Sequence, residues 1–128
     1  MSRTLGIDYG EKRIGLAVSD ETRTLARELA ILPPAAFWTQ LIGLLAEQEI
    51  DTIVLGWPLN MSGLETKKTA EVGRFRDKLE QAADLPVVIM DERLTSVMAR
   101  HLPGGDKNID SLAAQILLQN YLDRQHKE

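Results

Sequence analysis

The sequence predicts an α/β fold with a mixed five-stranded sheet and helices on both of its faces. Two short, fully apolar runs, 53–55 and 87–90, are typical of parallel strands that are buried on both sides. Segments with apolar residues at helical spacing alternate with these runs. The chain opens instead with two strand-like runs only four residues apart, which indicates an antiparallel hairpin. Its length fits one domain, so we expect residues 1–128 to form a single domain.

The first 32 residues are expected to supply three strands. Leu5–Tyr9 alternates, with its apolar side chains on one face, and Ile14–Val18 is a second strand-like run. The connector Gly10–Arg13 has the length and the glycine of a hairpin loop. A third strand is expected within residues 25–32, and two consecutive prolines end it.

The rest of the chain is expected to alternate helices and strands. In order, we expect a helix over 35–49, a strand over 52–56, a helix over 65–83, a strand over 87–90, a short helix over 95–101 and a last helix from Asp110. The inward-facing helix residues share an apolar stripe, and they are Phe37, Leu41, Leu44, Leu45, Val72, Phe75, Leu79, Leu112, Ile116 and Leu117. The polar tail 123–128 is expected to fray.

The composition narrows the class of function. The chain has no cysteine, which excludes disulfides, thiolate nucleophiles and thiolate zinc sites. It has no apolar stretch near the roughly 20 residues of a membrane helix. No export signal precedes the first strand, so we expect a cytoplasmic protein with no membrane partner. The net charge of -4 and the pI of about 5.2 argue against a domain that coats duplex nucleic acid by bulk electrostatics.

Asp8 is the first candidate for chemistry because it is a carboxylate inside an apolar strand. The pleat of a strand places Gly6, Asp8 and Gly10 on one side. Both glycines lack side chains, so we expect a metal or a phosphate to have an open approach to the carboxylate. The alternative is an aspartate that begins a turn at the end of a strand.

Further carboxylates follow the last predicted strand and begin the last predicted helix. Asp91 and Glu92 stand at a strand's carboxyl end, beyond which open α/β sheets bind their ligands. Adjacent strand residues face opposite ways, so only one of this pair is expected to share a site with Asp8. Asp110 fits a helix N-cap, and a carboxylate there can also meet a metal when the helix packs on the sheet.

Three carboxylates in an α/β domain favour a site for hard cations, since Mg²⁺ prefers oxygen ligands. Two such ions about 4 Å apart can activate a water and stabilise the leaving oxygen in phosphodiester hydrolysis. The loop 56–63 lacks the Gly-Lys-Ser/Thr ending of a P-loop, so it offers no rival phosphate chemistry. Lys12, Arg13 and Arg93 stand near the carboxylates in the sequence, whereas we interpret the pair 67–68 as solvated surface charge.

Four sequence blocks resemble the YqgF (RuvX) family, bacterial RNase H-like proteins known as pre-16S rRNA nucleases or Holliday junction resolvases. The blocks occur in the family's order and span nearly the whole chain, and they cover residues 6–20, 55–63, 91–96 and 110–122. The resemblance implies an RNase H-like fold whose second strand runs antiparallel to the others. It also implies an acidic site made of Asp8, Glu92 and Asp110, with Asp91 as a substitute for Glu92.

The chain departs from the family pattern in three places. Glu11 stands where a small hydroxyl residue is common, and Trp57 stands where an aliphatic one is common. Trp57 could stack on a base, but we expect a partly buried ring. The loop 102–109 is short and holds one lysine where relatives are often richly basic, which affects the grip on substrate near Asp110.

The resemblance implies a nuclease that uses Mg²⁺ or Mn²⁺ to hydrolyse phosphodiester bonds in structured RNA, at the 5′ end of pre-16S rRNA. We expect the substrate to contact Lys12, Arg13, Asn60 and Arg93, with RNA preferred over junction DNA and a monomer or weak homodimer as the active form. The alternatives are a Holliday junction resolvase and a non-catalytic RNA-binding factor in ribosome assembly. A nucleotide-binding ATPase of the sugar-kinase type needs two such lobes, and 128 residues supply one.

Overall fold

The computed structural model describes residues 2–60, 62–91 and 109–127, and in the last helix it describes the side chains of residues 112–126. Five strands form one sheet in the order β3-β2-β1-β4-β5. The strands are β1 (Arg3–Asp8), β2 (Ile14–Ser19), β3 (Ala26–Leu32), β4 (Ile50–Trp57) and β5 (Val87–Asp91). β2 pairs antiparallel with both β1 and β3, while β4 pairs parallel with β1 and with β5. The predicted mixed sheet, with only its second strand reversed, is therefore confirmed.

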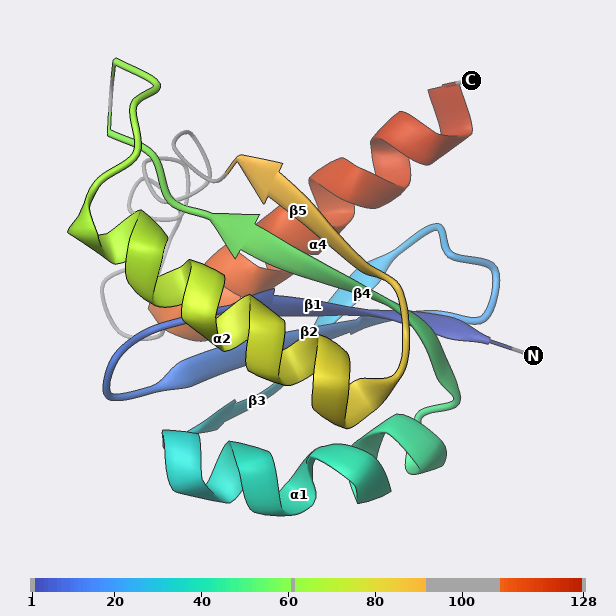
Figure 1. The fold of residues 1–128 in the computed structure, drawn as a ribbon. Helices are drawn as coiled ribbons and strands as arrows, with labels where there is room; N and C mark the ends of the chain where they lie inside the picture. The colour runs from blue at the N-terminus through green and yellow to red at the C-terminus, as the bar shows by residue number, and fades with distance from the viewer. Residues whose placement is uncertain (1, 61, 92–108, 128) are drawn as a thin grey trace.

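Three described helices cover the two faces of this sheet. They are α1 (Pro34–Glu47), α2 (Lys67–Ala83) and α4 (Ile109–Lys127). α1 and α2 lie on one face and α4 lies on the other (Figure 1). The helix expected over 95–101 falls outside the described residues. No helix in the described parts of the chain is both long enough and apolar enough to cross a membrane.

The alternation of β1 divides its side chains between two apolar cores. Leu5 and Ile7 are fully buried in the core under α1 and α2, as the sequence predicts. That core also holds Phe37, Leu41 and Leu45 of α1 and Val72, Phe75 and Leu79 of α2. Gly6 belongs to the other face, where α4 packs. Because Asp8 is two residues further along the strand, it lies on the α4 face as well.

The buried face of α4 differs from the predicted one. Leu112 and Ile116 are only half-buried, whereas Leu117 is fully buried as predicted. The other buried residues of the helix are Ala113, Ala114, Leu118 and Leu122. The reason is the close approach of the helix to the sheet. An added Cβ at Gly6 would stand 2.9 Å from the Cβ of Leu118, so the glycine lets this face of α4 pack closely on β1.

The polar tail also differs from the expectation, because α4 continues to Lys127 instead of fraying after residue 122. Its side chains bond to the backbone around the start of β3. Gln119 accepts from the Ala26 N–H and donates to the Thr24 carbonyl, both at 2.9 Å. His126 donates to the Arg23 carbonyl at 2.7 Å. These bonds hold the last turns of the helix against the β2–β3 turn.

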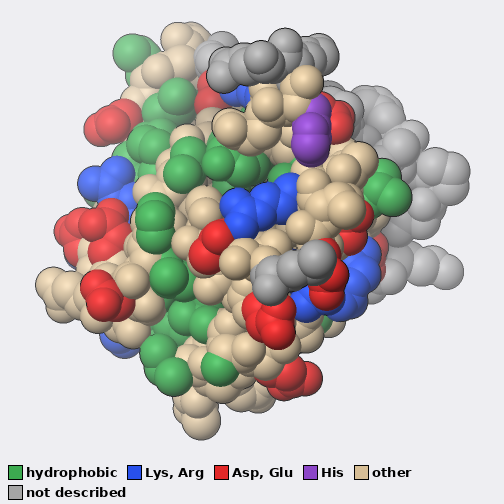
Figure 2. Space-filling model, turned by 90° about the vertical axis from the view of Figure 1, so that its right-hand side faces the viewer, with side chains coloured by type: hydrophobic (Ala, Val, Ile, Leu, Met, Phe, Trp, Pro, Cys, Tyr) green, Lys and Arg blue, Asp and Glu red, His purple; other side chains and the backbone are tan. Residues whose placement is uncertain are grey.

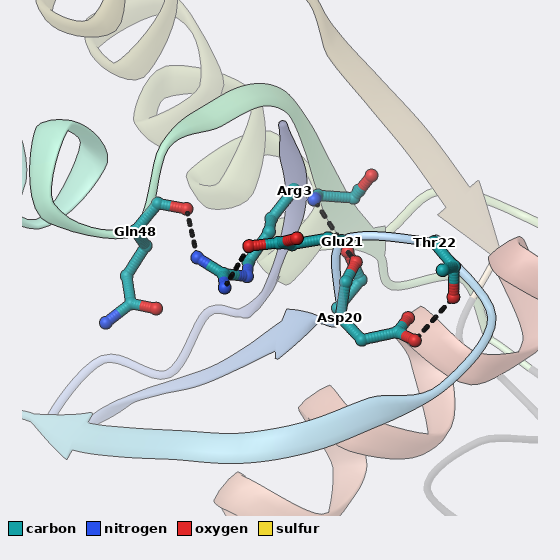
Figure 3. Close-up of polar contacts among 7 residues, drawn as sticks. Arg3, Asp20, Glu21, Thr22 and Gln48 are labelled. Atoms are coloured by element: carbon teal, nitrogen blue, oxygen red, sulfur yellow. Dashed lines mark hydrogen bonds and ion pairs between the residues drawn. The ribbon is translucent and has the colours of Figure 1, made fainter. Parts of the chain in front are cut away.

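Polar contacts hold together the end of the sheet where β1 begins (Figure 3). Arg3 donates to the Gln48 carbonyl and to Glu21, both at 3.3 Å. Asp20 accepts from the Thr22 hydroxyl and from two backbone N–H groups of the β2–β3 turn, which lower its pKa to about 2. Figure 2 faces this end and shows acidic and basic side chains interspersed across it. The charged side chains at this end therefore stabilise the turn, and they do not form a surface of uniform charge.

Candidate active site

The carboxyl ends of β1, β4 and β5 meet at one edge of the sheet, because these three strands are parallel. The hairpin loop of residues 9–13 and the β4–α2 loop of residues 58–66 leave from this edge (Figure 1). α4 begins at the same end, because its later turns are bonded to the opposite end through Gln119 and His126. Ligands of open α/β sheets bind beyond such strand ends. This edge is therefore the candidate ligand-binding region of the protein.

Asp8 is the last residue of β1 and is half-buried at this edge. Its neighbour Tyr9 points to the α2 face, where its ring packs 4.6 Å from the ring of Phe75. The Tyr9 hydroxyl donates to Glu71 at 3.4 Å. Burial, together with the Glu71 carboxylate, raises the pKa of Tyr9 above its ordinary value. These contacts fix the end of β1 to α2, so the position of Asp8 on the other face is set by packing.

The start of α4 is level with Asp8. The Gly6 contact sets the register, because an added Cβ there would meet the Ala114 carbonyl at 3.3 Å and the Leu118 Cβ at 2.9 Å. From Ala114 back to Asp110 is one helical turn, a rise of about 6 Å. From Gly6 on to Asp8 is two strand residues, about 6.6 Å in the same direction. The backbone at Asp110 is thus carried to the end of β1, while the Asp110 side chain lies outside the described part of the chain.

The expected open approach over Gly6 is wrong, because Leu118 and Ala114 of α4 occupy that space. Gly10 serves the hairpin rather than a ligand. A Cβ at this position would clash with the Arg13 carbonyl oxygen, so only glycine fits the tight loop. The two glycines therefore permit a close helix and a tight turn, and between them they leave Asp8 at the rim of the sheet.

Asp91 and Asp8 lie on opposite faces of the sheet. Met90 is buried in the α4-side core, so the next residue in the strand turns to the α2 side. The register agrees, because Asp91 pairs with Trp57, whose ring packs against the α2-side core. Glu92 lies outside the described residues.

The predicted substrate-binding residues lie in two loops at this edge. Lys12 and Arg13 are exposed on the hairpin loop. The Oδ1 atom of Asn60 accepts from the backbone N–H groups of Ser62 at 2.9 Å and Leu64 at 3.0 Å, so this side chain shapes the β4–α2 loop. Its Nδ2 group takes no part in those two bonds. Arg93 lies outside the described residues.

Trp57 is half-buried, as expected, and α2 covers part of its ring. The Arg76 guanidinium carbon lies 5.4 Å from the ring centroid, and a Cβ at Gly73 would touch the ring at 3.6 Å. This packing supports the interpretation of Trp57 as a core residue rather than a stacking platform for a base.

Lys67 and Lys68 are exposed, as the sequence interpretation has them, but their grouping with Arg74 was not predicted. Lys67, Lys68 and Arg74, with Glu11 and Glu71, line a hollow of about 500 Å³ beside the hairpin loop. Positions 67, 71 and 74 have the spacing of one helix face, and this is the signal that was available in the sequence. The hairpin loop contributes Glu11 to the lining, and its proximity to α2 arises only in the folded chain.

The donor chemistry at this edge fits a hard cation. Asp8 offers carboxylate oxygens from the rim of the sheet, and the α4 backbone brings a second aspartate position level with it. Among the side chains that the structure describes, no three acidic or histidine groups gather into a metal site. Two of the three predicted ligands, Glu92 and Asp110, have their side chains outside that set.

A five-stranded sheet with its second strand reversed, and a carboxylate at the end of its first strand, defines the RNase H-like class of fold. The fold resembles Thermus thermophilus RuvC in complex with a Holliday junction substrate. The TM-score is 0.64 at 13% identity, with 98% of this chain and 96% of the other covered.

The chain belongs to the RuvX family, described as "RuvX: Holliday junction resolvase", whose sequence model matches residues 2–124. A relative from Chloroflexus aggregans is 40% identical over 130 residues, covering 93% of this chain and 92% of its own. A relative from Geobacillus kaustophilus is 40% identical over 137 residues, covering 94% and 97%. Both are named "Putative pre-16S rRNA nuclease". The predicted family is therefore confirmed.

Proposed function

We propose that this chain is a metal-dependent nuclease that hydrolyses phosphodiester bonds in structured RNA and processes the 5′ end of pre-16S rRNA. The observation that carries the proposal is the Gly6 contact, which brings the start of α4 level with Asp8 at the ligand-binding edge of the sheet. The names of the curated relatives support the substrate. An rRNA-processing role places the enzyme in the cytoplasm.

In this proposal Asp8, Glu92 and Asp110 hold Mg²⁺ or Mn²⁺. Bound in a pair, such ions supply Lewis-acid stabilisation of the attacking and leaving oxygens. Asp8 contributes its carboxylate from a strand end that Tyr9 anchors to α2. Asp91 is set aside as a ligand because it lies on the other face of the sheet. Hydrolysis needs only water as the second reactant, since the oxygen of water joins phosphorus while one P–O bond breaks.

The substrate is held by cations outside the carboxylate cluster. Lys12 and Arg13 project from the hairpin loop that directly follows Asp8, so they reach a phosphate next to the cleaved bond. We assign Arg93, which follows Glu92 in sequence, the same task. Asn60 contributes by holding the β4–α2 loop in shape and by its remaining amide donors.

A Holliday junction resolvase is the second candidate, favoured by the family description. Resolving a four-way DNA junction needs two symmetric cuts and therefore a two-fold dimer whose active sites are suitably spaced. It also needs many phosphate contacts along several duplex arms. A chain with a net charge of -4 and small basic groups suits a local groove for single-stranded or looped RNA better. We accordingly propose a monomer or weak homodimer as the active form.

Initial rates of the pure protein on three substrates test the proposal: a pre-ribosomal RNA fragment, a single-stranded DNA and a synthetic four-way junction. Each is measured with and without Mn²⁺ at near-physiological salt. We expect Mn²⁺-dependent cleavage that is fastest on RNA. Paired, symmetric nicks in the junction at a higher rate than any RNA cleavage would establish the resolvase instead. RNA binding without cleavage of any substrate would establish a non-catalytic assembly factor.

A further inference from the structure

The hollow beside the hairpin loop lies at the same end of the sheet as Asp8 but on the α2 face. It measures about 500 Å³ and is lined by Glu11 of the hairpin loop and by Lys67, Lys68, Glu71 and Arg74 of α2. This volume is within the range of small-ligand pockets, so the hollow admits a nucleotide unit rather than a duplex.

The lining of the hollow is positive, although the whole chain carries a net charge of -4. Three cations face two carboxylates, and one of these, Glu71, accepts the hydroxyl of Tyr9 at 3.4 Å. Lys67 and Lys68 lie in the first turn of α2, where the N–H groups of the helix end add positive potential. Both lysines and Arg74 are exposed, so their ammonium and guanidinium groups are accessible to a ligand.

Two residues that follow Asp8 in the chain connect the hollow to the candidate site. Tyr9, next to Asp8, bonds to Glu71 in its wall, and Glu11, three residues after Asp8, forms its other side. Lys12 and Arg13, which follow Glu11 in the hairpin loop, are exposed. Cations are thus present both on the hairpin loop that follows Asp8 and on the part of α2 that lines the hollow.

We infer that this hollow binds backbone phosphates of the single-stranded part of the substrate, a few nucleotides away from the cleaved bond. The inference rests on the proposed nuclease function and extends it to where the substrate lies. Each phosphate carries one negative charge, and Lys and Arg are its ordinary partners. Because the lining is charged rather than aromatic, the hollow recognises the backbone and not the bases.

The test compares two double variants that each remove two positive charges. Lys67→Gln with Arg74→Gln changes the hollow, and glutamine keeps a high helix propensity. Arg27→Gln with Arg124→Gln is the matched control, because both residues are exposed and lie toward the opposite end of the sheet. Fluorescence anisotropy of labelled single-stranded oligouridylate is recorded over a salt titration without divalent cations, so binding is measured without cleavage.

We expect the hollow variant to bind more weakly at low salt. The negative slope of log K against log salt should become shallower by about 1.4, which is 0.7 for each lost contact. The control variant should keep the wild-type slope. A single-stranded oligodeoxynucleotide should show the same loss, because its phosphates are identical. Equal slopes in the two variants, or a loss confined to RNA, would overturn the inference.

Cleavage assays in Mn²⁺ separate this inference from the proposed function. The hollow variant should raise KM for RNA several-fold while kcat stays within a few-fold of wild type, since the hollow binds away from the reacting phosphate. If the wild-type protein cleaves nothing, the nuclease proposal fails, and the anisotropy slopes still decide whether the hollow binds phosphates. If the wild-type protein cleaves RNA and the hollow variant has an unchanged KM, the hollow inference alone fails.

Discussion

Gly6 is the position at which a single methyl group should disturb the fold and the candidate site together. A Cβ added there would lie 2.9 Å from the Cβ of Leu118 and 3.3 Å from the carbonyl oxygen of Ala114. Neither atom can rotate away, because the first is attached directly to the helix backbone and the second is part of it. Gly6→Ala therefore forces α4 to move away from β1.

The cost of this movement follows from the packing of α4. Leu117 and Leu118 are fully buried against the sheet, and a gap of about 0.5–1 Å already removes a quarter to a half of such dispersion contacts. Overpacking of a buried site costs about 1–3 kcal/mol. Since the first turn of α4 carries Asp110, the shift should also slow Mn²⁺-dependent cleavage beyond what the loss of stability explains.

Gly43→Ala is the matched control, because Gly43 lies in the exposed interior of α1 with no atom within 4 Å of an added Cβ. In a helix interior this change stabilises by about 0.5–1 kcal/mol. Urea denaturation of the wild type and both variants, with cleavage rates from the same preparations, gives the comparison. A Gly6→Ala protein as stable as the wild type would refute the close packing of α4 on β1.

Three further outcomes follow from other contacts. Tyr9→Phe removes the bond to Glu71 and keeps the ring, so the free energy of unfolding in urea should fall by about 0.5–1.5 kcal/mol; no change would show that the bond contributes nothing. The lowered pKa of Asp20, about 2, means that its contribution to stability is complete above pH 3.8 and is lost as the pH falls through 2; a carboxyl NMR titration with an ordinary midpoint would contradict this. Glu92→Gln should abolish cleavage and weaken Mn²⁺ binding, while Asp91→Asn should leave a measurable rate, and the reverse ranking would exchange their roles.

The sheet could be predicted from the sequence because its signals are local. The short connector at 10–13 fixes an antiparallel hairpin, and the apolar runs at 53–55 and 87–90 identify parallel strands. The face of Asp8 also follows from local alternation, since Tyr9 and Ile7 turn the other way.

The packing of α4 could not be predicted from periodicity alone. The stripe through Leu112 and Ile116 continues into polar residues, and the face that packs on the sheet is the one that holds Ala113, Ala114, Leu117, Leu118 and Leu122. The close approach of α4 to β1 depends on Gly6, which lies more than 100 residues earlier in the chain. Contacts between distant segments of this kind are not visible in a local pattern.

The acidic residues of the candidate site stay a prediction from the sequence, and the surroundings of the site could not be predicted. The hollow depends on the hairpin loop folding against α2, so Lys67 and Lys68 resemble ordinary surface charge in the sequence. Asn60 was predicted to contact the substrate. In the structure its Oδ1 atom accepts hydrogen bonds from two backbone N–H groups of its own loop.

The rate of Mn²⁺-dependent RNA cleavage by Asp8→Asn tests the central claim most directly. The substitution is nearly isosteric and removes the carboxylate charge, so the variant should still fold, which a melting curve checks. We expect the folded variant to cleave a pre-ribosomal RNA fragment slower by orders of magnitude. Cleavage within a few-fold of the wild-type rate would show that Asp8 is structural and that the active site lies elsewhere.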